Sequence, residues 1–383
     1  MDLFISLHGK LNLLKDEYSM FPSIKIKAIL CATAFAIAMS LETSSVLAAG
    51  GEMNLETQGI FWAGGEIANR TQKHLTKNKI LRDQLYVEYF IPKTLRPNAA
   101  PIVLTHTVIS GVIWRTTPDG REGWAEYLVR QGFPVFVIDP PGTGRSGFEI
   151  DDINTVATGD SQPMANAPLA RSDSSAWPRW NLGLSLAAGT QEEDQTPTDE
   201  ASTRHLLASL LPSRSIPVAK SHAAFIAALE KINEMQGPVI FVGWSLAGGL
   251  GQRLVVDRPD LFSALILLEG ASGQPPLPTP ENWFDYCSVK PSEPLVATLV
   301  KTGLPVLSLN GQKGHVVNTG HASGVCKSLV DDVNAGGGHA SSIWLPDLGI
   351  RGNGHMMFWD KNSDQIVKVI TDWIDRADIK KSK

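Results

Sequence analysis

The sequence predicts an α/β fold in which helices cover both faces of a mostly parallel sheet of about eight strands. The chain has 383 residues, of which 43% are hydrophobic and 19% charged, so it can bury a large core. After residue 50, short apolar runs alternate with helix-like stretches, which is the pattern of strands connected by crossover helices. Several of these runs lack a polar face, as is typical of parallel strands buried on both sides.

The strands and helices follow from these patterns in chain order. We expect strands at the apolar runs 60–62, 85–91, 102–105, 135–139, 239–242, 264–268, 306–309 and 342–345. We expect helices at 120–131, 221–235, 247–256, 324–333 and 363–376. In the last helix Ile366, Ile370 and Ile374 lie on one face. Asn362 and Ser363 supply capping residues at its start.

Residues 148–215 break the alternating pattern. The region is rich in Ser, Thr, Asp, Pro and Gly, and it contains Trp177 and Trp180. A stretch of this length without clear elements inside a compact domain is usually functional or disordered. We therefore expect a cap or lid inserted into a single domain of residues 49–383, with a mobile surface insertion as the alternative.

Residues 1–48 are expected to be a leader and signal peptide. Lys25 and Lys27 precede the apolar run 28–39, and small residues follow at the spacing that a signal peptidase reads. The run is shorter than the roughly 20 residues that span a bilayer, so an uncleaved membrane anchor is only the alternative.

Export has consequences for the mature chain. We expect it to start near Ala49, to be secreted or periplasmic in a bacterium, and to have no stable membrane anchor after cleavage. Cys287 and Cys326 then lie in an oxidising compartment, and we expect a disulfide between them, with two buried free thiols as the alternative. The sequence leaves open whether translation starts at Met1 or Met20.

The most informative stretch is 238–249, where an apolar run leads into Gly-x-Ser-x-Ala-Gly-Gly and then a helix-like segment. This pattern is typical of a nucleophile elbow, in which a serine occupies a strained strand-to-helix turn between small residues. Ser245 is therefore the candidate nucleophile. A small-residue turn without a catalytic role is the alternative, and the other members of a triad decide between them.

A serine nucleophile needs a histidine base and a carboxylate, which in this architecture follow it in the order acid and then histidine. His355 follows the last expected strand in the glycine-rich turn 351–357, so it is the candidate base. The strand at 306–309 leads into residues without a carboxylate, whereas the strand at 264–268 ends in Glu269. We predict Glu269 as the acid and keep Asp347 in reserve.

Two backbone amides are expected to form an oxyanion hole. One is the amide of Leu246, which follows the nucleophile, and the other is assigned to Thr107 in the loop after the strand 102–105. His106 is either a pocket residue or a buried structural histidine. Trp244, Trp177 and Trp180 are candidate pocket residues for an apolar or aromatic-bearing substrate, although tryptophans also serve as core.

Other functions are disfavoured by composition and spacing. His315, His321 and His339 match no compact ligand motif, so we expect no metal site. The formal net charge is -5 and the basic residues are scattered, so we expect no nucleic-acid partner. The oligomeric state is left open, a homodimer included.

Five segments together carry a family resemblance: 114–124, 137–146, the elbow, 268–270 and 354–357. They resemble the α/β-hydrolase superfamily, and within it the secreted bacterial esterases of the esterase 713 type. The similarity runs over most of residues 54–378 and is weakest at 150–215. It implies the α/β-hydrolase fold, with a triad of Ser245, Glu269 and His355 that cleaves carboxylic esters without a cofactor.

The sequence also departs from this family. Thr105-His106-Thr107 stands where the oxyanion loop usually begins with His-Gly, and Leu246 and Ala247 occupy elbow positions that are often polar or glycine. Neither change removes a backbone donor. We therefore expect a secreted serine esterase acting on a small-molecule ester. A lactonase or polyester-type hydrolase with the same triad, or a catalytically silent binding protein, is the alternative; acyl and alcohol specificity remain open.

Overall fold

The computed structural model describes residues 51–70, 77–159, 168–183, 194–214, 216, 218–270, 293–314 and 328–379. They belong to a compact unit that spans Ala49–Lys383. The predicted leader lies outside the described residues, as do Cys287, Cys326, His315 and His321. Among the described helices, none is long and apolar enough to cross a membrane.

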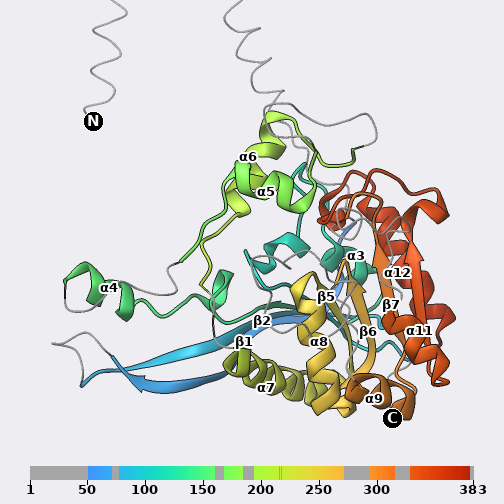
Figure 1. The fold of residues 1–383 in the computed structure, drawn as a ribbon, viewed down its shortest axis with the longest axis horizontal. Coiled ribbons are helices and arrows are strands. Elements are labelled where there is room, and N and C mark those ends of the chain that lie inside the picture. The colour runs from blue at the N-terminus through green and yellow to red at the C-terminus, as the bar shows by residue number, and fades with distance from the viewer. Residues whose placement is uncertain are drawn as a thin grey trace, which may run out of the picture. The chain divides into compact units, whose positions relative to one another are not determined.

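The described strands form one eight-stranded sheet in the order β1-β2-β4-β3-β5-β6-β7-β8 (Figure 1). β1 and β4 pair antiparallel with β2, and every other pairing in the sheet is parallel. This confirms the predicted mostly parallel sheet and its eight strands. The bounds are β1 Leu55–Asn69, β2 Lys79–Pro92, β3 Ile102–Thr105, β4 Val135–Asp139, β5 Val239–Trp244, β6 Phe262–Leu268, β7 Val306–Asn310 and β8 Ala340–Trp344.

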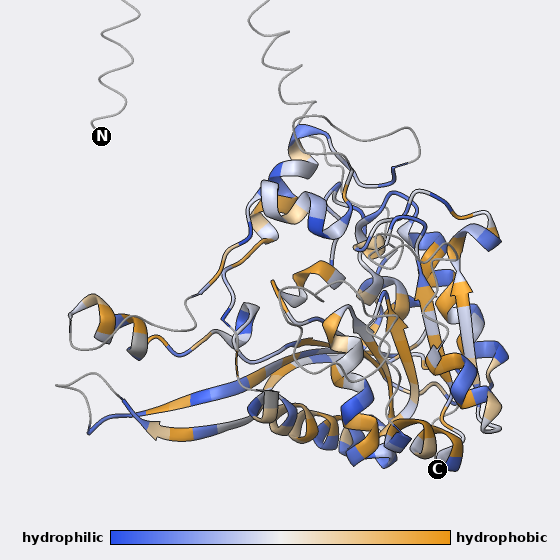
Figure 2. Cartoon of the chain, in the orientation of Figure 1, coloured by the Kyte–Doolittle hydropathy of each residue, from blue (hydrophilic) through white to orange (hydrophobic). Residues whose placement is uncertain are grey.

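The central strands are apolar because both of their faces are covered. Every residue of β3, β4, β5 and β7 is buried. Alternate residues of a strand point to opposite faces, so Ile240 and Val242 enter one apolar cluster while Val239 and Phe241 enter the other. Figure 2 shows the apolar residues gathered along these strands.

Two groups of helices cover the two faces. The first cluster contains residues of α3 (Trp124–Arg130) and α12 (Ser363–Arg376). The second contains residues of α7 (Val218–Gln236), α8 (Leu246–Asp257), α9 (Glu293–Thr302) and α11 (Ser328–Ala335). The predicted bounds of α12 are those observed. α9 was not predicted, although Leu295 and Leu299 are buried on one face of it.

The first hairpin extends well beyond the prediction, which gave only 60–62 and 85–91. β1 and β2 pair from Leu55 with Pro92 to Asn69 with Lys79. Most of β1 is exposed and lacks a continuous apolar run, and Gly64 and Gly65 interrupt it with positive φ angles. Cross-strand pairing, rather than local pattern, sets its length.

The region 148–215 holds three short helices among its described residues: α4 (Asp151–Ala157), α5 (Asp173–Trp180) and α6 (Glu200–Ser209). Ser172 and Ser175 form a capping box at the start of α5, and Asn181 ends it in the left-handed conformation. Short 3-10 turns connect other elements at Gly111–Trp114, Gly144–Ser146, Pro259–Leu261, Leu345–Leu348 and Met357–Trp359.

We expect Phe241→Ala to lower the free energy of unfolding by about 3–5 kcal/mol, because it leaves a cavity in a core that collapses only partly. Phe241 is fully buried, with its ring 5.8 Å from that of Phe262 and 6.3 Å from that of Phe225. Urea denaturation measures the change. Ile67→Ala in the exposed hairpin is the control and should change stability by less than about 0.5 kcal/mol.

Candidate active site

Ser245 lies at the sharp turn between β5 and α8. Its φ of 58° and ψ of -127° are strained for a residue with a side chain. A Cβ at Gly243 would come within 2.7 Å of the Ala247 carbonyl oxygen, so only glycine fits two residues before the serine. The Ser245 amide donates to the Leu268 carbonyl at 3.0 Å, which fixes the turn to the next strand. The backbone therefore has the geometry of a nucleophile elbow.

Glu269 lies beside this turn on the neighbouring strand. Trp244 and Leu268 form the last pair between β5 and β6. Ser245 and Glu269 come directly after them, so they lie side by side at the carboxyl ends of the two strands. Glu269 has a positive φ of 48° and is buried. Its backbone amide donates to the Leu309 carbonyl at 2.9 Å. The side chain is thereby directed from the sheet edge toward the loop that follows β7.

The loop after β7 holds the Glu269 carboxylate although it has no carboxylate of its own. The Gly311 amide donates to Oε1 at 2.6 Å. A Cβ built on Gly314 would overlap the carboxylate, so glycine is the only residue that fits at that point. A buried carboxylate needs such donors because it has lost its hydration. Apart from the two glycines themselves, no residue pattern predicts this support of Glu269.

His355 faces Glu269 in the buried interior. Its Nδ1 lies 3.5 Å from Glu269 Oε2, and both side chains are fully buried. The His355 amide donates to the Trp180 carbonyl at 2.9 Å, and Trp244 Nε1 donates to the His355 carbonyl at 2.8 Å. The structure therefore brings together the predicted acid and base, next to the strand end that carries Ser245. The reserve acid, Asp347, is exposed in the turn after β8.

Burial sets the protonation state of His355. It lowers the pKa of the imidazole well below its usual range, and the charge of Arg179 acts in the same direction. The ring is therefore neutral near pH 7 and can accept a proton. A carboxylate beside such a ring stabilises the imidazolium once a proton arrives.

The described parts of the insertion pack on the loops that carry these groups. Trp177 and Trp180 are buried in an apolar cluster, and the Trp180 ring lies 5.9 Å from that of Trp244. Asn181 Nδ2 donates to the Lys313 carbonyl at 2.7 Å, and Lys313 Nζ pairs with Asp194. These bonds attach the insertion to the loop after β7.

One candidate oxyanion donor begins helix α8, and the other lies in the loop after β3. Leu246 is the first residue of α8, where the helix leaves its amide without an intrahelical partner. Thr107 is half-buried in the loop after β3. His106 is fully buried, with Nε2 3.0 Å from Asp139 Oδ1, and this contact favours the structural role for that histidine.

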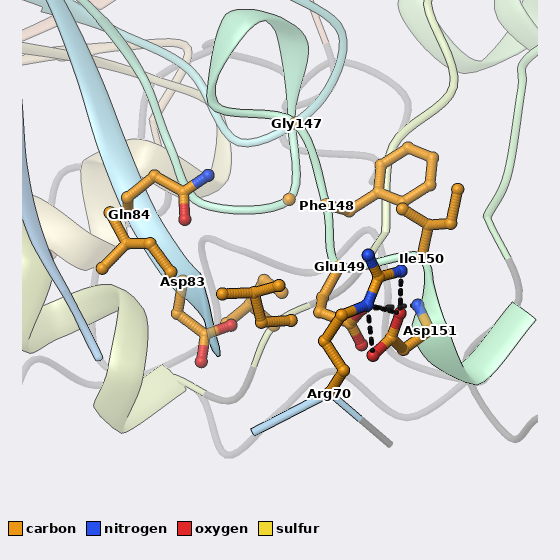
Figure 3. Close-up of a pocket in the computed structure, with 12 residues that line it drawn as sticks. Arg70, Asp83, Gln84, Gly147, Phe148, Glu149, Ile150 and Asp151 are labelled. Carbon is orange, nitrogen blue, oxygen red and sulfur yellow. Dashed lines mark hydrogen bonds and ion pairs between the residues drawn. The ribbon is translucent and has the colours of Figure 1, made fainter. Parts of the chain in front are cut away.

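Metal-ligating residues do not gather in the part of the chain that is described, where no group of three or more His, Cys, Asp or Glu could hold an ion. His339 is exposed just before β8. A pocket of about 190 Å³ lies between the first hairpin and residues 142–151, and no triad candidate lines it (Figure 3).

Known proteins share this fold. Residues 101–291 match a family model described as the alpha/beta hydrolase fold. The chain belongs to the α/β-hydrolase superfamily. This α/β-hydrolase is 28% identical to a novel bacterial esterase of known structure, with a TM-score of 0.70 and coverage of 86% of this chain and 98% of that one. It is also 24% identical to a fungal protein named "Probable secreted lipase phiG". That similarity extends over 340 residues, which are 76% of this chain and 86% of the fungal protein.

A buried aspartate that the sequence analysis missed supports the histidine loop of this α/β-hydrolase. Asp360 Oδ2 accepts from Asn353 Nδ2 at 2.8 Å, and Oδ1 accepts from Thr196 Oγ1 at 3.4 Å. Burial raises the pKa of Asp360 to about 7, against these hydrogen bonds and one from the Gly354 backbone. In the sequence, only its position between an apolar run and the start of α12 could have indicated that Asp360 is buried.

We expect Asp360→Asn to flatten the pH dependence of stability. The folded pKa is about 7 and the unfolded value is about 4, so the folded state holds an extra proton between them. The contribution of Asp360 to the free energy of unfolding is fully present below about pH 4 and is lost as the pH rises through about 7. Between pH 5 and pH 8, the free energy of unfolding of the wild type should fall by on the order of 2 kcal/mol more than that of the variant.

Urea denaturation at the two pH values measures this difference. Asp364→Asn, at an exposed site in the first turn of α12, is the control and should keep the wild-type slope. An equal slope in wild type and Asp360→Asn would contradict the assignment.

Proposed function

We propose that this α/β-hydrolase cleaves carboxylic esters through Ser245, His355 and Glu269. The observation that carries the proposal is the buried contact between His355 and Glu269 beside the strained serine. The order nucleophile, acid and base along the chain is then that of this superfamily. The bacterial esterase and the protein named as a secreted lipase, to which the chain is similar, support ester cleavage.

The proposed mechanism has two halves. His355 accepts the proton of Ser245 Oγ, and the oxygen attacks the ester carbonyl carbon. The tetrahedral intermediate collapses as His355 gives the proton to the departing alcohol oxygen, which leaves an acyl-enzyme. Water then attacks the acyl carbon while His355 takes its proton, and the second intermediate collapses as His355 returns that proton to Ser245 Oγ, which releases the carboxylic acid. Glu269 stays ionised and holds the imidazolium.

The two oxyanion donors are proposed to be the backbone amides of Leu246 and Thr107. They follow β5 and β3, which are neighbours in the sheet, so both loops leave the same edge. Amides that are fixed before the reaction stabilise the developing charge without reorganisation.

Substrate and location are proposed from the surroundings of the site. The Trp244 ring lies 5.1 Å from that of His355, and the Trp180 ring packs against Trp244, which supports an apolar or aromatic-bearing ester. Secretion is supported by the leader pattern and by the name of the similar fungal protein. The proposed Cys287–Cys326 disulfide belongs to the same exported state.

We expect Ser245→Ala to abolish hydrolysis of short- and medium-chain nitrophenyl esters and labelling by a fluorophosphonate. Glu269→Gln should lower kcat by about a hundredfold or more, because the amide cannot stabilise the imidazolium as a carboxylate does. Wild-type protein that neither turns over these esters nor takes the label would instead indicate a binding protein.

We also expect Gly314→Ala to lower kcat by about a hundredfold, because the added methyl group displaces the Glu269 carboxylate that holds His355. Nitrophenyl ester kinetics measure the loss, and the melting temperature reports whether the variant is folded. Gly51→Ala is the matched control, since its Cβ would meet only Arg130 Cδ, at 3.7 Å. Wild-type kcat in a folded Gly314→Ala protein would argue against this support of Glu269.

A further inference from the structure

The loop of residues 106–111 is held at both ends by one buried side chain that the proposed mechanism does not use. The loop follows β3 and contains Thr107, the proposed second oxyanion donor. At its first residue, His106 Nε2 lies 3.0 Å from Asp139 Oδ1. At its last residue, the Gly111 amide donates to the same oxygen. Asp139 is the last residue of β4, next to β3 in the sheet.

The second oxygen of Asp139 is held from the opposite side. Oδ2 accepts from the Arg145 amide at 2.8 Å and from Arg145 Nε at 2.7 Å. Ser110 Oγ lies 3.5 Å from it. Arg145 is in turn held by Glu88, at 2.6 Å from Nη1. The carboxylate therefore has a fixed orientation and cannot follow the loop if the loop moves.

The carboxylate is charged under ordinary conditions. Burial alone would raise the pKa of Asp139, but the hydrogen bond and charge of His106 and the guanidinium of Arg145 lower it well below its usual range. Charge-assisted hydrogen bonds are stronger than neutral ones. Between the two anchors the backbone is strained, since Ile109 has a positive φ of 69°, and such a loop keeps its shape only while its ends are held.

We propose that Asp139 is a positioning residue for the oxyanion hole, which it forms indirectly by fixing both ends of loop 106–111 through His106 and Gly111. The proposal rests on the proposed function, because it concerns the amide that stabilises the tetrahedral intermediate. It assigns a role to the Asp-x-x-Gly-x-Gly-Arg-Ser segment of the sequence: Asp139 and Arg145 hold the loop of a different strand.

The test compares Asp139→Asn with wild type. An amide turns an NH₂ group toward one of the Asp139 donors, so one side of the clamp is released. We expect kcat for a nitrophenyl ester to fall by about 10²–10³-fold with little change in KM, as for loss of an oxyanion donor. The affinity for a boronic acid inhibitor, which becomes tetrahedral when Ser245 Oγ adds to boron, should fall by a similar factor, whereas the affinity for a planar amide analogue of the substrate should not.

Asp151→Asn provides a matched control. Asp151 is also a fully buried aspartate paired with an arginine, since Arg70 Nη2 lies 2.5 Å from its Oδ1 in the pocket near the first hairpin (Figure 3). This variant should lose stability and keep the wild-type ratio of boronic acid to amide affinity. A merely structural role for Asp139 would give that same result.

Gly111→Ala gives a second route if Asp139→Asn does not fold. Its Cβ would lie 2.8 Å from Asp139 Oδ1, so it displaces one end of the loop and leaves the charge in place. An unchanged affinity ratio in the folded variants, with Ser245→Ala inactive and wild type active, would overturn this inference alone. An inactive wild type would overturn the proposed function as well.

Discussion

The need to satisfy buried carboxylates organises the carboxyl edge of this sheet. Glu269, Asp139 and Asp360 are all buried there or in the loop next to it. A carboxylate without water must be hydrogen-bonded, and the donors available at a sheet edge are mainly the amides of neighbouring loops. Each carboxylate therefore binds a neighbouring loop, and the positions of His355 and of the loop after β3 depend on these contacts.

The same need explains why glycines surround the site. For a backbone amide to reach a carboxylate that lies against it, the residue can have no side chain on that side. Gly111, whose amide donates to Asp139, meets this condition, and Gly314 leaves to the Glu269 carboxylate the space that a Cβ would fill. In the sequence these glycines appear as generic turn residues. In the structure each is required by a particular acidic side chain that comes from a different strand.

The sequence was sufficient where the decisive information is local. The strand positions followed from apolar runs, and α12 from one amphipathic face. Ser245, Glu269 and His355 were predicted at one edge because parallel strands all end there. The extent of the first hairpin was not predictable, since it depends on pairing of β2 with β1, which is mostly exposed. Neither were the partners of His106 and Asp360, because Asp139 is 33 residues away from the first and Thr196 is 164 residues away from the second.

His355 relies on the insertion, because its amide donates to the carbonyl of Trp180, whose ring packs against Trp244, the tryptophan that contacts the His355 ring. Where an inserted segment only covers a site, the whole segment can be exchanged while the reacting groups stay in place. In this chain, residues 177–181 help to hold the histidine in position. Replacing the whole segment between β4 and β5 would remove these contacts to the histidine, so the side chains near it are more readily changed by single replacements within the segment than by segment exchange.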